Sequence, residues 1–145
     1  MVYYGEYNQV LDGKNRMRMP MKLKVQLGSE YYILNGANGC LLVMDAGRFN
    51  DMTAQFARVP LSDSAARRVV SEIMASVVVP EEDAQGRFVL PARAIRYAGI
   101  SKNIVIVGAC DYIEIWSEEK YNANTDSAEE ESLDAKLLKL REYGV

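Results

Sequence analysis

The side chains of this 145-residue chain that are best suited to binding chemistry are concentrated in a short basic stretch near its start. Residues 12–24 contain one acid, Asp12, and five cations, namely Lys14, Arg16, Arg18, Lys22 and Lys24. The stretch therefore carries a local charge of +4, whereas the whole chain carries −3. Clustered lysines and arginines can neutralise phosphates, so the stretch predicts a nucleic-acid-binding surface. A solvated basic loop is the alternative that charge alone leaves open.

The residue types that the chain lacks exclude several other kinds of chemistry. There is no histidine, so His-based nucleophile activation, His-ligated metals and a His general base are impossible. Cys40 and Cys110 are far apart and lack a CxxC partner, so they predict neither a zinc knuckle nor a disulfide framework. We expect both to be reduced and partly buried.

Acidic clusters offer the only remaining route to catalysis. The best candidates are residues 81–83 and the pair Asp111 and Glu114, and neither has the spacing of a metal site. We therefore expect no enzyme, no metal and no cofactor, with a small hydrolase or a Mg-dependent activity as the enzymatic alternative. The longest apolar run, residues 104–107, is far below the roughly 20 residues of a spanning helix, and no signal pattern opens the chain. We expect a cytoplasmic protein without a membrane partner.

The chain contains an internal repeat. DGKNRMRMPMKLKVQLG, starting at Asp12, aligns with DAQGRFVLPARAIRYAG, starting at Asp83, at an offset of 71 residues. The match resumes at an offset of 72, where residues 33–49 align with residues 105–121. Each copy is a unit of about 45 residues, which is too small for a comfortable core of its own. We therefore expect the two copies to pack on each other.

Local sequence rules predict the same elements in both copies. Each Asp-x-x-x-Arg segment is expected to be a turn, and Asn15 and Gly86 share a repeat position at which positive φ is tolerated. Extended segments are expected before and after the turns, at residues 3–11, 16–19, 75–79 and 87–90. A short helix should follow each proline and end at Gly28 or Gly99. Hairpins are expected at residues 31–34 with 40–44, and at 104–107 with 112–116.

Helices are predicted between and after the copies. Apolar residues recur at helical spacing in residues 48–59 and 61–78, on either side of Pro60. In residues 127–143 the same spacing places Leu133, Leu137 and Leu140 on one face.

Two Asp-x-x-x-Arg turns, each followed by a strand, a proline and a short helix, closely resemble the MraZ family of bacterial transcriptional regulators. The resemblance covers residues 1–122 and lies in LDGKNRMRMP, DAQGRFVLP, the opening YGEY and the run IVIVGACDYIEIW. One departure is visible at Asn15, where the family's first motif usually has the glycine that the second copy retains at Gly86.

The resemblance implies a fold, a domain order and a function. The fold would be α+β and mainly β, with two pseudo-symmetric AbrB-like swapped-hairpin units forming a small barrel, linking helices and a C-terminal helix. The domains would be a first repeat (1–49), a helical linker (50–74), a second repeat (75–122) and a helical tail (123–145). The function would be sequence-specific regulation of transcription by a nucleoid-associated homo-oligomeric ring, bound to direct repeats in the promoter of the division and cell-wall gene cluster.

The chemistry of the turns supports this interpretation and suggests a role for each residue. Backbone N–H groups and cations can bind phosphates, and an arginine side chain can donate two hydrogen bonds to the edge of a guanine. We expect DNA contacts from Lys14, Arg16, Arg18 and Arg87, and loop-structuring roles for Asp12, Asn15, Asp83 and Gly86. The alternative is that the two turn arginines serve only the ion pairs with their aspartates. Because the first copy has more cations, we expect its loop to dominate binding.

A rival hypothesis is a structural or protein-binding ring subunit that does not bind DNA. It would use aromatic residues expected at the surface, namely Tyr3, Tyr4, Tyr31 and Tyr32, together with the acidic tail. Retention on heparin that weakens steeply with salt would favour the DNA-binding hypothesis. Both hypotheses expect a closed homo-oligomer, because the apolar residues exceed what one small core can hide.

Overall fold

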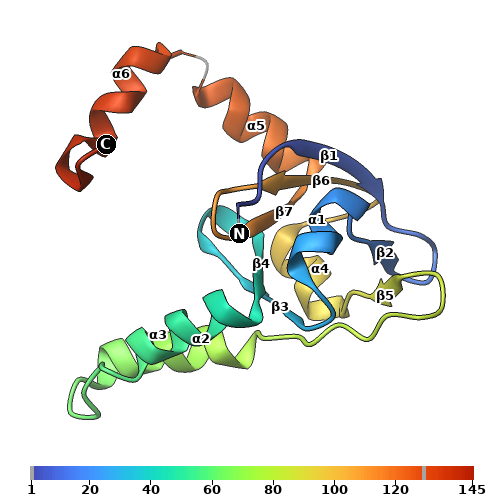
Figure 1. The fold of residues 1–145 in the computed structure, drawn as a ribbon, viewed down its shortest axis with the longest axis horizontal. Coiled ribbons are helices and arrows are strands. Elements are labelled where there is room, and N and C mark those ends of the chain that lie inside the picture. Colours follow the sequence, from blue (N-terminus) through green and yellow to red (C-terminus); the bar gives the residue numbers. More distant parts are fainter. Residues whose placement is uncertain (1, 129) are drawn as a thin grey trace.

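The computed structural model describes residues 2–128 and 130–145, and it confirms the predicted α+β class (Figure 1). Its strands are β1 (Glu6–Val10), β2 (Arg16–Arg18), β3 (Tyr31–Asn35), β4 (Leu41–Asp45), β5 (Arg87–Val89), β6 (Asn103–Gly108) and β7 (Ile113–Ser117). Its helices are α1 (Met21–Leu27), α2 (Ala46–Phe56), α3 (Ser64–Ala75), α4 (Ala92–Ala98), α5 (Glu118–Ala128) and α6 (Leu133–Leu137), with short 3-10 helices η1 (Ala37–Gly39) and η2 (Leu138–Tyr143).

The main sheet interleaves the two copies of the repeat. Its strand order is β1-β6-β7-β4-β3, and every neighbouring pair is antiparallel. The first copy's β1 therefore pairs with the second copy's β6, with Tyr7 opposite Ile106. At this crossing the backbones come so close that a Cβ on Gly108 would lie 2.2 Å from the backbone N of Tyr4. The two copies were expected to pack on each other, and they do so by contributing strands to one common sheet.

A separate two-stranded ribbon also joins the copies. β2 and β5 are antiparallel, with Met17 opposite Phe88. Both of these side chains are buried in the main hydrophobic core, against which α1 and α4 pack. The two helices follow Pro20 and Pro91 and end at glycines with positive φ, as the sequence predicted.

The predicted closed barrel is wrong for this chain, because the main sheet is open. Its edge strands, β1 and β3, do not pair with each other. Closure would require a full strand of the second copy along β3, and the expected strand at residues 75–79 is not formed. The helix α3 continues to Ala75, and only Val78 forms a bridge, to Ile33. Pro80, which lacks an N–H donor, lies two residues after Val78.

The opening strand is also shorter than expected. β1 begins at Glu6, and Gly5 adopts φ +93°, which breaks the extended run predicted from residue 3. Before this break, Tyr3 forms an isolated bridge to Cys110. Cys110 is exposed and Cys40 is buried, so partial burial of both cysteines was not a correct expectation.

Two of the four tyrosines expected at the surface are buried. Tyr3 is 1% exposed and its hydroxyl donates to Asp45 Oδ2 at 2.5 Å, while Tyr31 is 2% exposed. Tyr4 is exposed, and Tyr32 is partly buried, with its ring stacked on Phe49. Each buried hydroxyl has a carboxylate partner, so burial of the apolar ring does not leave a polar group unsatisfied.

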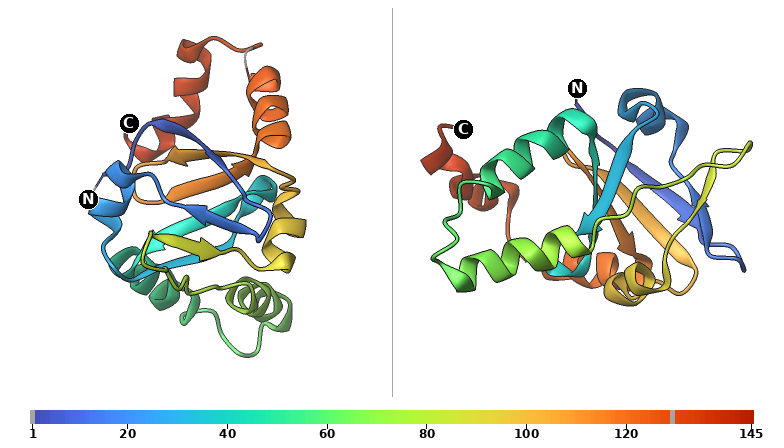
Figure 2. Two further views of the ribbon diagram at one scale, coloured as in Figure 1. Left: turned by 90° about the vertical axis from the view of Figure 1, so that its right-hand side faces the viewer. Right: turned by 90° about the horizontal axis from the view of Figure 1, so that it is seen from below.

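Two arms extend from the strand-rich body (Figures 1 and 2). The first is the helical pair α2 and α3, whose N-termini are capped by Asp45 and Asp63. The second is the tail, which consists of α5, α6 and η2. The single helix predicted over residues 127–143 is not formed, because its described part is divided among the end of α5, α6 and η2, and residue 129 lies outside the described residues. The tail's leucine face is exposed at Leu133, Leu137 and Leu140. In the described part of the chain, no helix is both long and apolar enough to cross a membrane.

Candidate nucleic-acid interface

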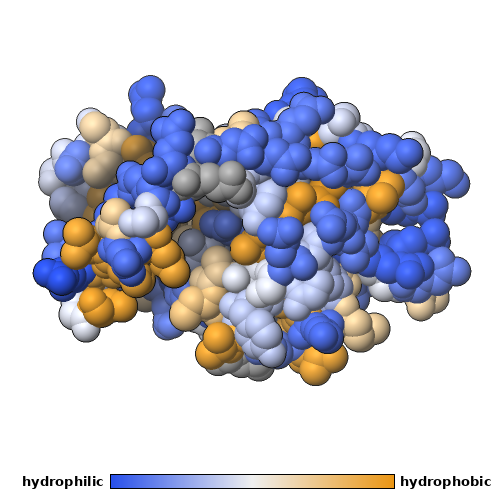
Figure 3. Space-filling model, turned by 90° about the horizontal axis from the view of Figure 1, so that it is seen from above, coloured by the Kyte–Doolittle hydropathy of each residue, from blue (hydrophilic) through white to orange (hydrophobic). Residues whose placement is uncertain are grey.

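The two Asp-x-x-x-Arg loops project from the same side of the molecule (Figure 1). We call residues 12–15 loop one and residues 83–86 loop two; they lead into β2 and β5. Because these strands are antiparallel, the loops lie at opposite ends of the ribbon (Figure 2). The surface at this end of the molecule is largely hydrophilic, whereas apolar side chains reach the surface at the opposite end (Figure 3).

Loop one is held by a single carboxylate. Asp12 Oδ1 accepts hydrogen bonds from the backbone N–H groups of Lys14 and Arg16, both at 2.9 Å. Asp12 Oδ2 accepts from Arg16 Nε at 2.8 Å. Asn15 adopts φ 60°, as its residue type predicted. Its own side chains thus hold the loop, and the carbonyl of Asn15 also accepts from the backbone N–H of Leu90 at 2.8 Å.

Loop two repeats this pattern. Asp83 Oδ1 accepts from the N–H groups of Gln85 and Arg87 at 2.9 Å, and Asp83 Oδ2 accepts from Arg87 Nε at 2.9 Å. Gly86 adopts φ 78°. A Cβ at Gly86 would meet nothing within 4 Å, so the backbone conformation and not a lack of space favours glycine there.

These contacts lower the pKa of both aspartates. For Asp12 the largest cause is the hydrogen bond from the backbone N–H of Arg16, and for Asp83 it is the equivalent bond from Arg87. Each ionised carboxylate accepts three hydrogen bonds, which favour its charged form. The aspartates therefore keep their negative charge, and with it the loop shape, at neutral pH.

The ion pairs engage only part of the hydrogen-bond donors of the two turn arginines, Arg16 and Arg87. Each pair engages Nε, one of five N–H donors on a guanidinium group. The side chains of Arg16 and Arg87 are 27% and 29% exposed. Each can therefore hold its loop and present its guanidinium edge to a phosphate or a guanine at the same time.

The structure brings three of the four predicted DNA-contacting residues to one groove. Arg16, Arg18 and Arg87 line a shallow groove of about 340 Å³, and Arg18 lies directly opposite Arg87 in the ribbon. Lys14 does not line this groove and is exposed on loop one.

Sequence reasoning missed other residues of the groove. Its wall includes Asn8 and Gln9 from β1, together with Val10. The sequence showed only that these residues belong to a strand. They lie beside β2 because loop one connects the two strands, and the groove is completed by the pairing of β2 with β5, which the repeat alone did not reveal.

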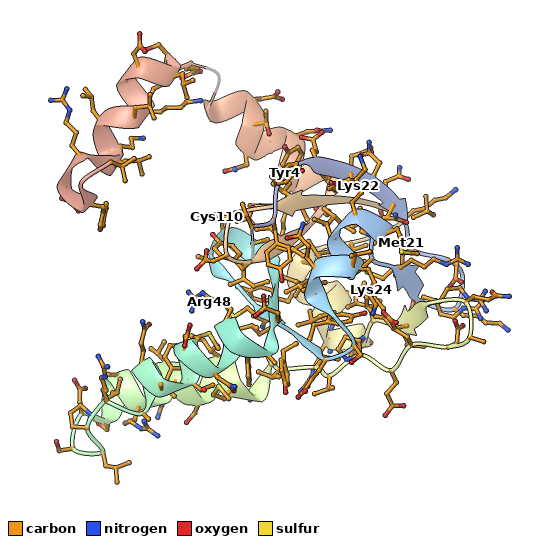
Figure 4. All side chains as sticks on the ribbon, viewed as in Figure 1. Tyr4, Met21, Lys22, Lys24, Arg48 and Cys110 are labelled. Atoms are coloured by element: carbon orange, nitrogen blue, oxygen red, sulfur yellow. The ribbon has the colours of Figure 1, made fainter. Side chains whose placement is uncertain are left out.

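The predicted basic stretch is divided by the fold. Lys22 and Lys24 lie on α1 and not in the loops (Figure 4). The ammonium group of Lys24 lies 3.4 Å from Glu82 Oε1 and donates to the carbonyl of Gly28 at 2.9 Å. Lys24 therefore has a structural partner, and the loop cations carry the local charge.

Asp111 and Glu114, which were weighed for catalysis, have structural partners as well. Asp111 pairs with Arg48 at 2.7 Å, and Glu114 accepts from Trp116 Nε1 at 3.0 Å. Across residues 2–128 and 130–145, no three His, Cys, Asp or Glu side chains form a group that could hold a metal ion.

Comparison with known proteins gives consistent matches over both copies. A family model described as "MraZ protein, putative antitoxin-like" matches residues 2–71 and 75–140. A protein of Mycoplasmopsis pulmonis named "Transcriptional regulator MraZ" is 35% identical over 145 residues, covering 100% of this chain and 99% of its own. A protein of Clostridium acetobutylicum with the same name is 33% identical over 144 residues, covering 99% of this chain and 100% of its own. One of Ligilactobacillus salivarius, again with that name, is 33% identical over 129 residues, covering 89% and 90% of the two chains.

Proposed function

Because the chain belongs to the MraZ family, we propose that it is a sequence-specific DNA-binding transcriptional regulator. Its relatives carry the name of transcriptional regulators, and the loops supply a surface suited to DNA. The observation that carries the proposal is the pairing of two carboxylate-braced arginine loops on one side of the molecule. Arg16 and Arg87 would donate hydrogen bonds to base edges, and Lys14 and Arg18 would form ion pairs with phosphates.

The ribbon of β2 and β5 gives this surface a suitable shape. A two-stranded ribbon can enter the major groove of B-DNA, which is about 12 Å wide. The loops at its two ends would then reach the flanking phosphates. We propose that the shared strands of the two copies correspond to AbrB-like swapped-hairpin units, within the repeats 1–49 and 75–122.

Assembly is the second element of the proposal. One subunit offers few cations, so useful affinity should require several subunits on repeated promoter sites. The exposed tail leucines, Leu133, Leu137 and Leu140, support a closed homo-oligomer because such a face is normally covered. We propose a ring that binds direct repeats in the promoter of the division and cell-wall gene cluster.

Fluorescence anisotropy with promoter DNA tests the proposal. We expect tight binding to DNA with three or more repeats, weak binding to one repeat, and a steep loss of affinity with salt. Light scattering at micromolar concentration should report an oligomer. Equal affinity for one repeat and three would contradict the avidity argument, and a monomer would contradict the ring. Binding that is absent at low salt would favour the protein-binding subunit instead.

A further inference from the structure

The chain approaches its two loops in different ways. Loop one follows β1, a five-residue strand, and the residue directly before it, Leu11, is 6% exposed in the main core. The backbone N–H of Leu11 also donates to the carbonyl of Lys102 at 2.8 Å. Loop two follows an extended segment whose one strand-like contact is the bridge between Val78 and Ile33. Loop two therefore lacks the sheet that holds the start of loop one.

A charged residue stands where loop one has its buried leucine. At the repeat offset of 71, Leu11 corresponds to Glu82. Glu82 Oε2 accepts from the hydroxyl of Tyr31 at 2.5 Å, and Glu82 Oε1 lies 3.4 Å from Lys24 Nζ. The glutamate side chain is only 25% exposed, although it lies in a connecting segment.

Tyr31 contacts both ends of loop two. Its hydroxyl holds Glu82, directly before the loop, and its ring packs edge-to-face on Phe88, directly after Arg87, with centroids 6.2 Å apart. Tyr31 is 2% exposed, and Lys24 Nζ lies 5.6 Å from its ring centroid. One side chain in β3 thus contacts both the residue directly before loop two and the strand that directly follows the loop.

From these contacts we infer that Glu82, held by Tyr31 and Lys24, is a positioning residue that sets loop two so that Arg87 can meet DNA. Glu82 does not itself touch DNA. It replaces, with a hydrogen bond and an ion pair, the support that β1 and Leu11 give to loop one. This inference rests on the proposed function, since it assigns Arg87 a DNA contact.

The first test measures the loop without DNA, by millisecond hydrogen–deuterium exchange on the full chain. Tyr31→Phe removes the hydroxyl and keeps the ring, and Glu82→Leu installs the residue of the first copy. In both variants the N–H groups of Gln85 and Arg87, which donate to Asp83, should exchange about tenfold faster. The N–H groups of loop one should be unchanged. Equal acceleration in both loops, or none in loop two, would overturn the inference.

Two further variants serve as controls. Tyr32→Phe removes a neighbouring hydroxyl that is also bonded to a glutamate, Glu30, and it should leave both loops unchanged. Glu82→Gln keeps an acceptor for Tyr31, so its loop-two exchange should stay within about twofold of the unmodified chain. A Glu82→Gln variant as mobile as Glu82→Leu would show that the hydrogen bond does not position the loop.

The second test links the anchor to binding through a double-mutant cycle. Glu82→Leu should weaken binding to multi-repeat DNA about fivefold in the unmodified chain and in an Arg16→Ala background. The loss should vanish in an Arg87→Ala background, because loop two then has no arginine to position. An undiminished loss in the Arg87→Ala background would overturn the inference. If the unmodified chain does not bind DNA at all, the proposed function fails, while the exchange result still decides whether Glu82 holds loop two.

Discussion

Loop one and loop two share the same internal hydrogen bonds but differ in charge and in their support. In both, an aspartate accepts from two backbone N–H groups and from an arginine Nε. Around this common pattern, Lys14 and Arg18 of the first copy correspond to Gln85 and Val89 of the second. Both copies therefore keep the hydrogen bonds that the backbone of the turn requires. The cations that DNA binding requires are distributed unequally between them.

The largest difference should appear in stability. Leu11→Ala removes a buried side chain and leaves a cavity in the main core, so we expect it to lower the free energy of unfolding by about 2–5 kcal/mol. Glu82→Ala removes a partly exposed ion pair and leaves the buried Tyr31 hydroxyl without its acceptor, so it should cost less than Leu11→Ala, about 1–3 kcal/mol. Urea denaturation of both variants provides the measurement. Similar losses of stability in the two variants would mean that the segments preceding loop one and loop two support the fold equally.

Next in size is the difference between the two turn arginines. An arginine contact with a base edge is worth about 1–3 kcal/mol, so Arg16→Ala should weaken DNA binding about tenfold or more. Arg87→Ala should weaken it less, because loop two has fewer cations beside it. Parallel anisotropy titrations at one salt concentration compare the two variants. Should Arg16→Ala melt several degrees lower, with bound DNA tracking the folded fraction, the arginine would be structural.

An exchange of charges between the copies should have a smaller, graded effect. Lys14→Gln combined with Arg18→Val gives loop one and β2 the charge of loop two and β5. The slope of log affinity against log salt should become shallower by about 2, one for each lost phosphate contact. Gln85→Lys combined with Val89→Arg should steepen the slope of the unmodified chain by a similar amount. Unchanged slopes in both variants would show that these side chains do not contact DNA phosphates.

The smallest expected difference is in the titration of the two aspartates. Both have a pKa below the ordinary value, for the same cause, so the two curves should nearly coincide in a carbon-detected NMR titration. Because the folded pKa is the lower one, each carboxylate stabilises its loop above the unfolded pKa. That stability is lost as pH falls through the folded pKa. An ordinary pKa at one aspartate would show that its loop opens in solution.

Local rules predicted much of each copy. Pro20 and Pro91 mark the starts of α1 and α4, because proline fits the first turn of a helix and lacks an N–H donor. Asn15 and Gly86 indicated left-handed turns, which the structure has. These features depend on residues close together in sequence, so a single chain is enough to predict them.

Contacts between distant residues could not be predicted in this way. Nothing local pairs β2 with β5, which brings Arg87 into the groove beside Arg18. Tyr31 looks like a surface aromatic until Glu82 is seen to satisfy its hydroxyl. The hydrogen bonds of Asp12 were predictable from turn chemistry, whereas the contribution of each cation to DNA binding stays a prediction.

The interleaved sheet has a consequence for how the protein is made. β1 leaves the ribosome early, but its partners begin at Asn103, roughly 90 residues later. At about 5–20 residues per second, β1 waits on the order of 5–20 s for a partner. Until residues 87–89 emerge, the β3–β4 hairpin is the one strand pair of the described sheets that can form; β2 can then pair with β5, while β1 still waits for β6. A message truncated before Asn103 therefore encodes a chain whose β1 is unpaired and prone to aggregation, and not half a regulator.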